Sequence, residues 1–239
     1  MTVVSPVVRT VRPGDPGWDE ARAAFNAGVD QRPHHVAEPA DAAGVAEVVR
    51  AAAAAGLRVV AQRTGHGAAA LGDLRDTVLV RNSALRDVRI DVAARRARIG
   101  AGARWGDVVA PAASAGLLAP HGSSAGIGVA GYALHGGVGW YVRAHGLAAH
   151  AIVAAELVTG DGTRVRVDAG REPELLSAPA RRRRAGDRHR ARARAAAGRP
   201  ALRWRRVLPD RAGRRGPARL AGLGRARARA HHVDRAAPA

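Results

Sequence analysis

The chain of 239 residues carries a formal net charge of +19, and all 39 of its basic residues are arginine. It contains no cysteine, which excludes disulfides, thiolate metal sites and cysteine nucleophiles. No run of about 18 apolar residues predicts a membrane-spanning helix, and the first 17 residues lack the apolar core of a secretory signal. We therefore expect a cytoplasmic protein without a membrane partner.

The positive charge is concentrated in the last quarter of the chain. Residues 1–178 contain 19 Arg and 17 acidic residues, for a net charge of +2, whereas residues 179–239 contain 20 Arg and three acidic residues, for +17. The few apolar residues of 179–239 follow neither a helical nor a strand period. Such a segment buries too little area to offset its ordering entropy, so we expect residues 179–239 to be disordered.

The first half of the body predicts alternating helices and strands. Asp41 is a candidate N-cap, apolar residues follow at helical spacing, and Gly56 is the expected helix end. The apolar runs 57–61 and 77–80 predict two buried strands. Alternation over 88–92, followed by the run 97–101, predicts an antiparallel hairpin.

The second half of the body predicts one more helix and a second hairpin. Residues 105–115 form the expected helix, and Gly116 ends it. The strand 152–159 is followed by an Asp161-Gly162 turn and by alternation over 163–167. The pattern therefore places parallel, crossover-type pairing early in the chain and antiparallel pairing later.

Two glycine-rich loops are the candidate site. The first, Arg63–Gly67, directly follows the strand 57–61; the second, His121–Gly131, is followed by another glycine-rich stretch at 136–140. Glycine allows backbone N–H groups to approach an anion closely, and successive N–H groups can form a concave site for a pyrophosphate. Neither loop has the sequence of a P-loop or of the Rossmann fingerprint. By themselves the loops are equally consistent with tight turns in a glycine-rich chain.

The order of these motifs resembles the FAD-binding domain of the vanillyl-alcohol oxidase/p-cresol methylhydroxylase (PCMH-type) family, in particular its berberine-bridge-enzyme-like branch. The resemblance runs from about residue 32 to residue 178 and also includes the stretches 102–108 and 156–162. It implies an α+β fold with a small parallel α/β subdomain and an antiparallel α/β subdomain, here incomplete at the C-terminus. We expect an N-terminal extension at 1–31, the partial FAD-binding domain at 32–178 and the Arg-rich tail at 179–239.

The resemblance also implies that FAD is the cofactor, with its pyrophosphate between the two loops. The residues expected to bind it are Arg63, Thr64, Gly65, His66, Gly67, Gly122, Ser123, Ser124, Gly126, Gly128 and Gly131. The reaction implied is removal of a hydride from an alcohol, sugar or amine carbon by the flavin, followed by reoxidation by oxygen. The implied partners are therefore FAD and a small-molecule substrate, and the sequence assigns neither a catalytic base nor an oligomeric state.

The chain departs from the family pattern at the residues that attach flavin covalently. Many members bond FAD to the His of an Arg-Ser-Gly-Gly-His stretch, and His66 is the candidate here, although its stretch is one residue shorter. His66 is equally consistent with a loop histidine that only forms hydrogen bonds. Ser124 stands where bicovalent members have a cysteine, so a second covalent bond is excluded.

The remaining polar residues are weaker candidates. His34 and His35 are expected to be solvated. His121, His135 and His145 lie in or near the glycine region, where they could line the flavin site, and are expected to be polar loop residues. They lack metal-ligand spacing, so no metal site is predicted. Asp107 is expected to stabilise the start of a helix rather than act as a catalytic base.

The tail is consistent with a shifted reading frame. Under an assumed codon choice, one inserted base near codon 179 converts a family-like Leu-Arg-Gly-Gly-Gly-Gly into the observed sequence at 179–184. The substrate domain and the catalytic base would then be missing, and the chain would be an inactive fragment of an oxidoreductase. The alternative is a non-enzymatic FAD-fold remnant whose basic tail binds nucleic acid nonspecifically through counterion release.

Overall fold

The structure is a computed structural model, and it describes residues 8–172, 198–204 and 208–209. The helices are α1 (Trp18–Arg22), α2 (Ala42–Ala54), α3 (Trp105–Ser114), α4 (Val129–Leu134) and α5 (Val142–His145), with short 3-10 helices η1 (Ala68–Ala70) and η2 (Ala148–Ala151). The strands are β1 (Val8–Val11), β2 (His35–Pro39), β3 (Arg58–Gln62), β4 (Thr77–Arg81), β5 (Val88–Asp91), β6 (Arg96–Gly100), β7 (Leu117–Leu118), β8 (Ile152–Val158), β9 (Arg164–Asp168), β10 (Gly198–Trp204) and β11 (Leu208–Pro209). No helix in this described part is long and apolar enough to cross a membrane.

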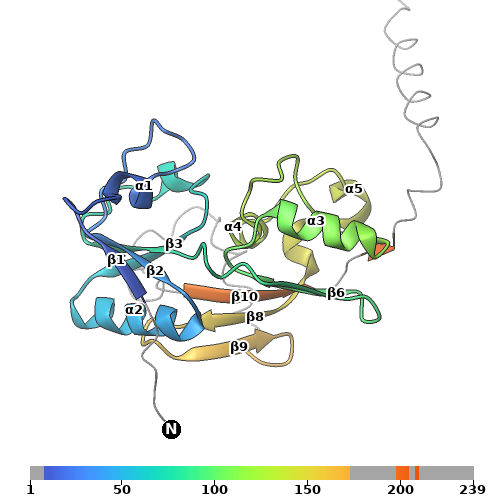
Figure 1. Cartoon of the computed structure of the whole chain (residues 1–239). Helices are drawn as coiled ribbons and strands as arrows, with labels where there is room; N and C mark the ends of the chain where they lie inside the picture. Colours follow the sequence, from blue (N-terminus) through green and yellow to red (C-terminus); the bar gives the residue numbers. More distant parts are fainter. Residues whose placement is uncertain (1–7, 173–197, 205–207, 210–239) are drawn as a thin grey trace, which may run out of the picture.

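The first sheet has the strand order β1-β2-β4-β3 and is parallel except at one edge (Figure 1). β2, β4 and β3 are parallel neighbours, and β1 pairs antiparallel with β2 through Val8–Val11. The sheet thus begins at Val8, N-terminal to the boundary expected at residue 32. The small parallel α/β subdomain expected from the resemblance is present.

Helix α2 joins β2 to β3 of the first sheet and also packs against the second sheet. Its N-cap Asp41 accepts a hydrogen bond from the N–H of Gly44 at 2.8 Å, and the chain leaves the helix at Gly56 with φ of +69°. Val49 of α2, Val78 of β4 and Val158 of β8 belong to one buried cluster. One helix therefore packs on both sheets, because apolar residues at helical spacing give it a wide buried face.

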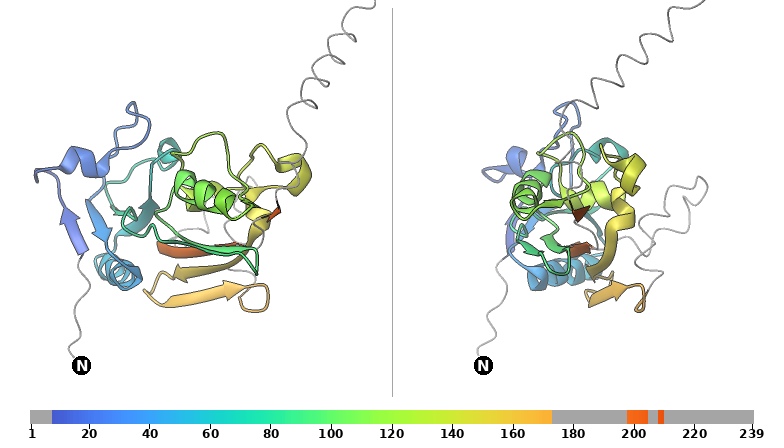
Figure 2. Two further views of the ribbon diagram at one scale, coloured as in Figure 1. Left: turned by 45° about the vertical axis from the view of Figure 1, so that its right-hand side comes forward. Right: turned by 90° about the vertical axis from the view of Figure 1, so that its right-hand side faces the viewer.

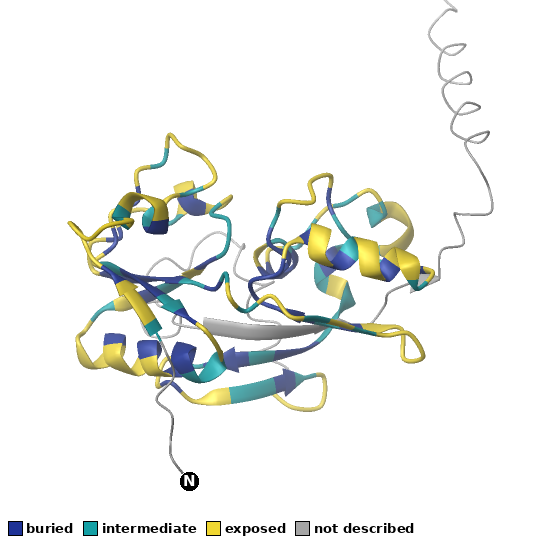
Figure 3. Cartoon of the chain, in the orientation of Figure 1, coloured by how far each residue is buried: buried dark blue, intermediate teal, exposed yellow. Residues whose placement is uncertain are grey.

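The second sheet is antiparallel, with the strand order β5-β6-β10-β8-β9. Helices α3, α4 and α5 lie on the same side of this sheet (Figures 1 and 2). The core beneath them includes Trp105, which is 1% exposed, together with Ile99 and Val108. Buried residues line the inner sides of α2 and α3, and their outer sides are exposed (Figure 3).

The structure differs from the sequence expectation at two short segments of the tail. β10 lies between β6 and β8, and β11 pairs with β7, so the disorder predicted for 179–239 does not hold at these strands. A strand between β6 and β8 satisfies backbone groups of both neighbours, and backbone pairing does not require a regular side-chain period. Its register with β8 shifts between Gly198 and Ala201, a stretch that contains Pro200, which has no N–H to donate. The rest of 179–239 lies outside the described residues.

Candidate functional site

The two glycine loops lie on different sheets and meet. The first loop, Arg63–Gly67, leaves the carboxyl end of β3 and leads into η1; the second loop, His121–Gly128, joins β7 to α4. A Cβ placed on Gly128 would lie 3.1 Å from Cβ of Arg63 and 3.9 Å from Oγ1 of Thr64. The loops are therefore in van der Waals contact, and a side chain at position 128 would require Arg63 to move by a few tenths of an ångström.

The second loop is held by hydrogen bonds to residues 103–106, at the start of α3. The N–H of Trp105 donates to the carbonyl of Ile127 at 3.0 Å, that of Gly106 to Ala125 at 2.9 Å, and that of Val129 to Ala103 at 3.0 Å. These bonds fix the backbone of the loop before any ligand arrives. A preorganised loop binds a ligand without first losing conformational entropy.

Both loops present backbone N–H groups that remain available. Within the described residues, none of the N–H groups of Thr64–Gly67, Ser123 or Ser124 donates a hydrogen bond. Successive unpaired N–H groups form a concave site with positive potential. The hydroxyls of Ser123 and Ser124 are exposed on the same loop, and that of Ser124 accepts from the N–H of Gly126 at 3.3 Å.

Arginine side chains surround the point where the loops meet. Nε of Arg63 donates to the carbonyl of Gly102 at 2.5 Å, and its NH1 donates to the hydroxyl of Ser83 at 3.2 Å. Burial lowers the pKa of Arg63, the positive charges of Arg104, Arg81 and Arg86 lower it further, and the Asp107 carboxylate partly opposes them. None of these four guanidinium groups belongs to an ion pair within the described part of the chain. An anion bound here would relieve their mutual repulsion.

His66 is held by two neighbours. Its Nδ1 lies 2.8 Å from the Thr64 hydroxyl, and its ring stacks on that of Phe25 with 3.8 Å between centroids and 15° between planes. Phe25 comes from the segment between α1 and β2, which the sequence placed in an N-terminal extension. Nothing in the local sequence of Phe25 signals this contact, because it depends on how two distant segments pack.

Two of the residues expected to bind FAD have other surroundings. A Cβ on Gly122 would lie 3.1 Å from the Tyr132 ring, so this glycine leaves room for a half-buried aromatic side chain. Burial raises the pKa of Tyr132, whose hydroxyl has no hydrogen-bond partner among the described residues.

Gly131 is exposed within α4 and has open space around it. Gly67 immediately precedes η1, and Gly126 is exposed in the second loop.

The sequence did not single out three buried amide side chains behind the first loop. Nε2 of Gln31 donates to Oε1 of Gln62 at 3.1 Å, and Nδ2 of Asn82 donates to the carbonyl of Ala101 at 3.2 Å. Oδ1 of Asn82 is buried and has no partner in the described residues. A Cβ on Gly102 would lie 1.9 Å from the carbonyl oxygen of Asn82, so this turn requires glycine.

The other candidate polar residues serve local structure. The N–H of Arg104 donates to Oδ2 of Asp107 at 2.8 Å, which confirms Asp107 as a helix-start carboxylate. Nδ1 of His121 lies 2.6 Å from the Gly122 carbonyl, and Nδ1 of His135 lies 2.7 Å from the Gly131 carbonyl. In the described part of the chain, the ring interactions and side-chain hydrogen bonds of His34 and His35 are with each other, and His145 lies in α5, away from both loops in the sequence. No group of three metal-ligating side chains occurs within the described residues.

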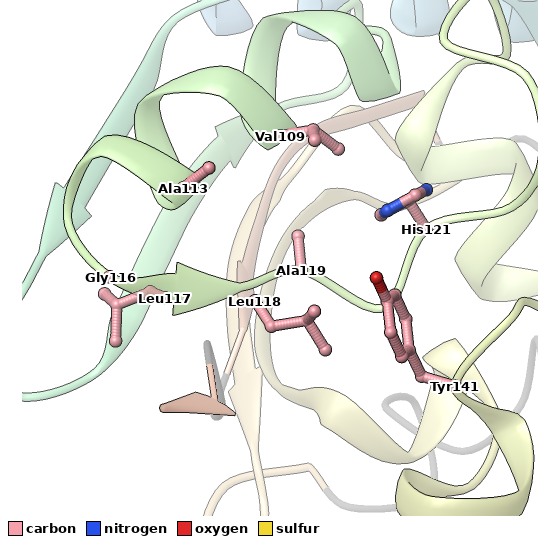
Figure 4. A pocket seen from close by; sticks show the side chains of 8 residues that line it. All are labelled: Val109, Ala113, Gly116, Leu117, Leu118, Ala119, His121 and Tyr141. Atoms are coloured by element: carbon pink, nitrogen blue, oxygen red, sulfur yellow. The ribbon is translucent and has the colours of Figure 1, made fainter. Parts of the chain in front are cut away.

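A pocket of about 200 Å³ adjoins the second loop. It is lined by Val109 and Ala113 of α3, by residues 116–119, and by His121 and Tyr141, which lie next to each other at one side of it (Figure 4). The rings of His121 and Tyr141 are edge-to-face, with 5.7 Å between centroids. The lining combines small apolar side chains with exposed backbone and with two polar aromatic side chains, His121 and Tyr141.

The residues of this site fit the FAD that the sequence resemblance implies. The contact between the loops, the available N–H groups and the unpaired arginines together suit a pyrophosphate, which carries two negative charges and many acceptor oxygens. A nicotinamide dinucleotide also carries a pyrophosphate, so this geometry identifies the anion and not the rest of the cofactor.

Comparisons with known proteins identify the cofactor class. The profile of the FAD binding domain family matches residues 33–168. The (R)-6-hydroxynicotine oxidase of Paenarthrobacter nicotinovorans is 34% identical over 166 residues, which are 70% of this chain and 36% of that enzyme. The chain thus spans about a third of the length of this relative.

Solved structures agree with this result. The 6-hydroxy-D-nicotine oxidase of Arthrobacter nicotinovorans matches with a TM-score of 0.73 and 28% identity, over 86% of this chain and 43% of that one. A variant of the BBE-like 1 protein of Physcomitrella patens matches with a TM-score of 0.71 and 29% identity, over 85% of this chain and 42% of that one. The α+β fold with a PCMH-type FAD-binding architecture is therefore confirmed.

Proposed function

The chain belongs to the FAD binding domain family of PCMH-type FAD-linked oxidases, and we propose that it binds FAD with the pyrophosphate between the loops 63–67 and 121–128. The observation that carries this proposal is the approach of Gly128 to Arg63, in a position surrounded by unpaired guanidinium groups. The glycine brings the two backbones together, and the arginines supply the charge that a pyrophosphate requires.

Each part of the site has a defined role in this proposal. Arg63 is tied by its own hydrogen bonds to Gly102 and Ser83, so its charge is fixed in position. The N–H groups of Thr64–Gly67 and the hydroxyls of Ser123 and Ser124 donate to phosphate oxygens. His66 contacts the flavin portion of FAD, either through a histidyl bond or through a hydrogen bond alone.

When bound, FAD supplies the capacity to accept a hydride from an alcohol, sugar or amine carbon. The chain covers 36% of (R)-6-hydroxynicotine oxidase, and none of its described residues is placed as a catalytic base. We therefore propose that this chain binds the cofactor and that oxidation of a substrate requires a substrate domain in addition to the FAD-binding domain.

The origin of the tail is part of the same proposal. A single inserted base near codon 179 accounts for both the family-like glycine sequence in the shifted frame and the jump in charge after residue 178. Sequencing the gene around this codon tests it. A downstream shifted frame that encodes more of an FAD-linked oxidase supports the proposal, and stop codons in every shifted frame contradict it.

The cofactor assignment is tested by adding FAD and NAD separately to the purified chain. Binding is followed by quenching of flavin fluorescence for FAD and by calorimetry for both ligands. We expect saturable binding of FAD and none of NAD. A cooperatively folded chain that binds no FAD would overturn the proposal.

A further inference from the structure

Phe25 is a large apolar side chain that remains 69% exposed although it stacks on His66. A single exposed apolar side chain needs no special explanation, and what distinguishes this ring is the specific contact that it makes. The rings are nearly parallel, with planes 15° apart, and their separation of 3.8 Å is a full stacking contact. One face of the His66 imidazole is therefore covered.

The backbone that carries Phe25 is anchored to the base of the first loop. The carbonyl of Ala23 accepts from Nε2 of Gln62 at 3.3 Å and from NH1 of Arg81 at 2.9 Å. A Cβ on Gly65, whose φ is +73°, would lie 2.9 Å from Cα of Ala24. The segment thus lies directly against the loop, and the position of Phe25 follows from backbone contacts.

Thr64 restricts the rotation of the His66 imidazole. Its hydroxyl lies 2.8 Å from Nδ1 of His66, so rotation of the ring by a half-turn would break this hydrogen bond. Nε2 of His66 has no hydrogen-bond partner among the described residues, and the residue is exposed. With one face covered and Nδ1 occupied, Nε2 is the ring nitrogen left for a ligand.

We propose that Phe25 is a positioning residue that, together with Thr64, holds the His66 imidazole so that its Nε2 is presented to FAD. This inference rests on the proposed FAD site. It adds to the site a residue from the N-terminal segment 23–31, and it assigns different roles to the two ring nitrogens of His66. Phe25 acts through His66 and does not need to touch the cofactor itself.

The experiment combines imidazole ¹⁵N spectra with FAD titration on the full chain. The variants are Phe25→Ala, Phe25→Tyr, His66→Ala and the double variant Phe25→Ala/His66→Ala. The matched control is Val92→Ala, which removes another exposed apolar side chain, 54% exposed, from the β5–β6 turn. Thermal unfolding of each variant separates a loss of folding from a loss of positioning.

We expect Phe25→Ala to shift the His66 ¹⁵N signals toward those of a freely rotating imidazole and to weaken FAD binding about five- to tenfold. Phe25→Tyr retains the stack and should match the parent chain, as should Val92→Ala. In the double variant the Phe25 change should add nothing to the loss caused by His66→Ala. Flavin that stays with acid-precipitated protein is covalently attached, and the ratio of bound flavin to protein is then measured instead of the dissociation constant. This ratio should fall in Phe25→Ala and stay at the parent value in Phe25→Tyr and Val92→Ala.

Unchanged His66 signals and an unchanged FAD affinity in folded Phe25→Ala would overturn the inference. Additive losses in the double variant would overturn it as well, because they would show that Phe25 acts independently of His66. A parent chain that binds no FAD would refute the proposed function, while the ¹⁵N signals would still show whether Phe25 fixes the ring.

Discussion

Gly128 lies directly against Arg63: a methyl group on this glycine would stand 3.1 Å from Cβ and 3.2 Å from Cγ of the arginine. The two residues are 65 positions apart in the sequence, and they join a loop of the parallel sheet to a loop associated with the antiparallel sheet. A bound pyrophosphate at this junction would contact both subdomains. We therefore propose that cofactor binding depends on the closeness of the two loops.

Substitution of Gly128 tests this contact. We expect Gly128→Val to separate the loops and weaken FAD binding about tenfold or more, because overpacking at a close contact forces the backbone to move. Gly128→Ala should cause a smaller loss, since a shift of a few tenths of an ångström at Arg63 accommodates one methyl group. FAD titration measures both, and equal affinity of the valine variant and the parent chain would refute the role of this contact.

Substitution of Gly102 should affect the stability of the fold and not only FAD binding. A Cβ at this position would lie 1.9 Å from the carbonyl oxygen of Asn82, so Gly102→Ala requires a backbone shift. We expect it to lower the free energy of unfolding by about 1–3 kcal/mol or more. Urea denaturation measures the change.

Gly131→Ala is the matched control for that experiment. Gly131 lies within α4 with open space around its Cα, so alanine should raise stability by about 0.5–1 kcal/mol through its better helix propensity. Destabilisation by this substitution would show that the packing around α4 differs from this description. A weaker FAD affinity in a stable Gly131→Ala variant would support the sequence-based assignment of Gly131 to the cofactor site.

We expect the folded chain to lose stability in weakly acidic solution because of His35. Burial lowers the pKa of His35 below its ordinary value of 6.5, and the neighbouring charges of His34 and Arg12 lower this pKa further. The unfolded chain therefore takes up a proton at a higher pH than the folded chain. The associated stability is present above about pH 6.5 and is lost as the pH falls through the pKa of the folded state.

The measurement is urea denaturation at several pH values between 7.5 and 5. We expect His35→Gln to flatten the decline seen in the parent chain over this range, whereas His145→Gln, which removes an exposed histidine of α5, should leave the decline intact. An identical pH profile in the parent and in His35→Gln would contradict the assignment.

Turnover is expected to be absent. Because the proposed reaction requires a substrate domain in addition to the FAD-binding domain, added alcohols, sugars or amines should neither bleach bound flavin under anaerobic conditions nor produce hydrogen peroxide in air. Peroxide formation that depends on such a substrate would contradict the proposed dependence on a separate substrate domain.

Helix ends and tight turns could be predicted from the sequence because each depends on a few neighbouring residues. Asp41 begins α2 and Gly116 ends α3 as expected, and the Asp161-Gly162 turn joins β8 to β9. Such residues act through the conformation of their own backbone, which is visible in a short window of sequence.

The long-range contacts were not predictable in the same way. The stack of Phe25 on His66 and the packing of Gly122 on Tyr132 arise from segments brought together by the whole fold. β10 was also missed, since pairing with β6 and β8 uses backbone groups that every sequence provides. The two glycine loops were found because the order of several motifs along the chain carries more information than any one of them.

The most direct test of the pyrophosphate site is calorimetric titration of FAD, ADP and riboflavin into the parent chain, Arg63→Ala and Arg96→Ala. Arg96 is an exposed arginine of β6 outside the loops and serves as the control. We predict that the parent chain binds FAD and ADP but not riboflavin, which lacks phosphate. Arg63→Ala should weaken both bound ligands by about 10- to 100-fold, and Arg96→Ala should leave them unchanged. Equal binding of FAD by folded Arg63→Ala and by the parent chain, or binding of riboflavin as tightly as FAD, would contradict a pyrophosphate site between the two loops.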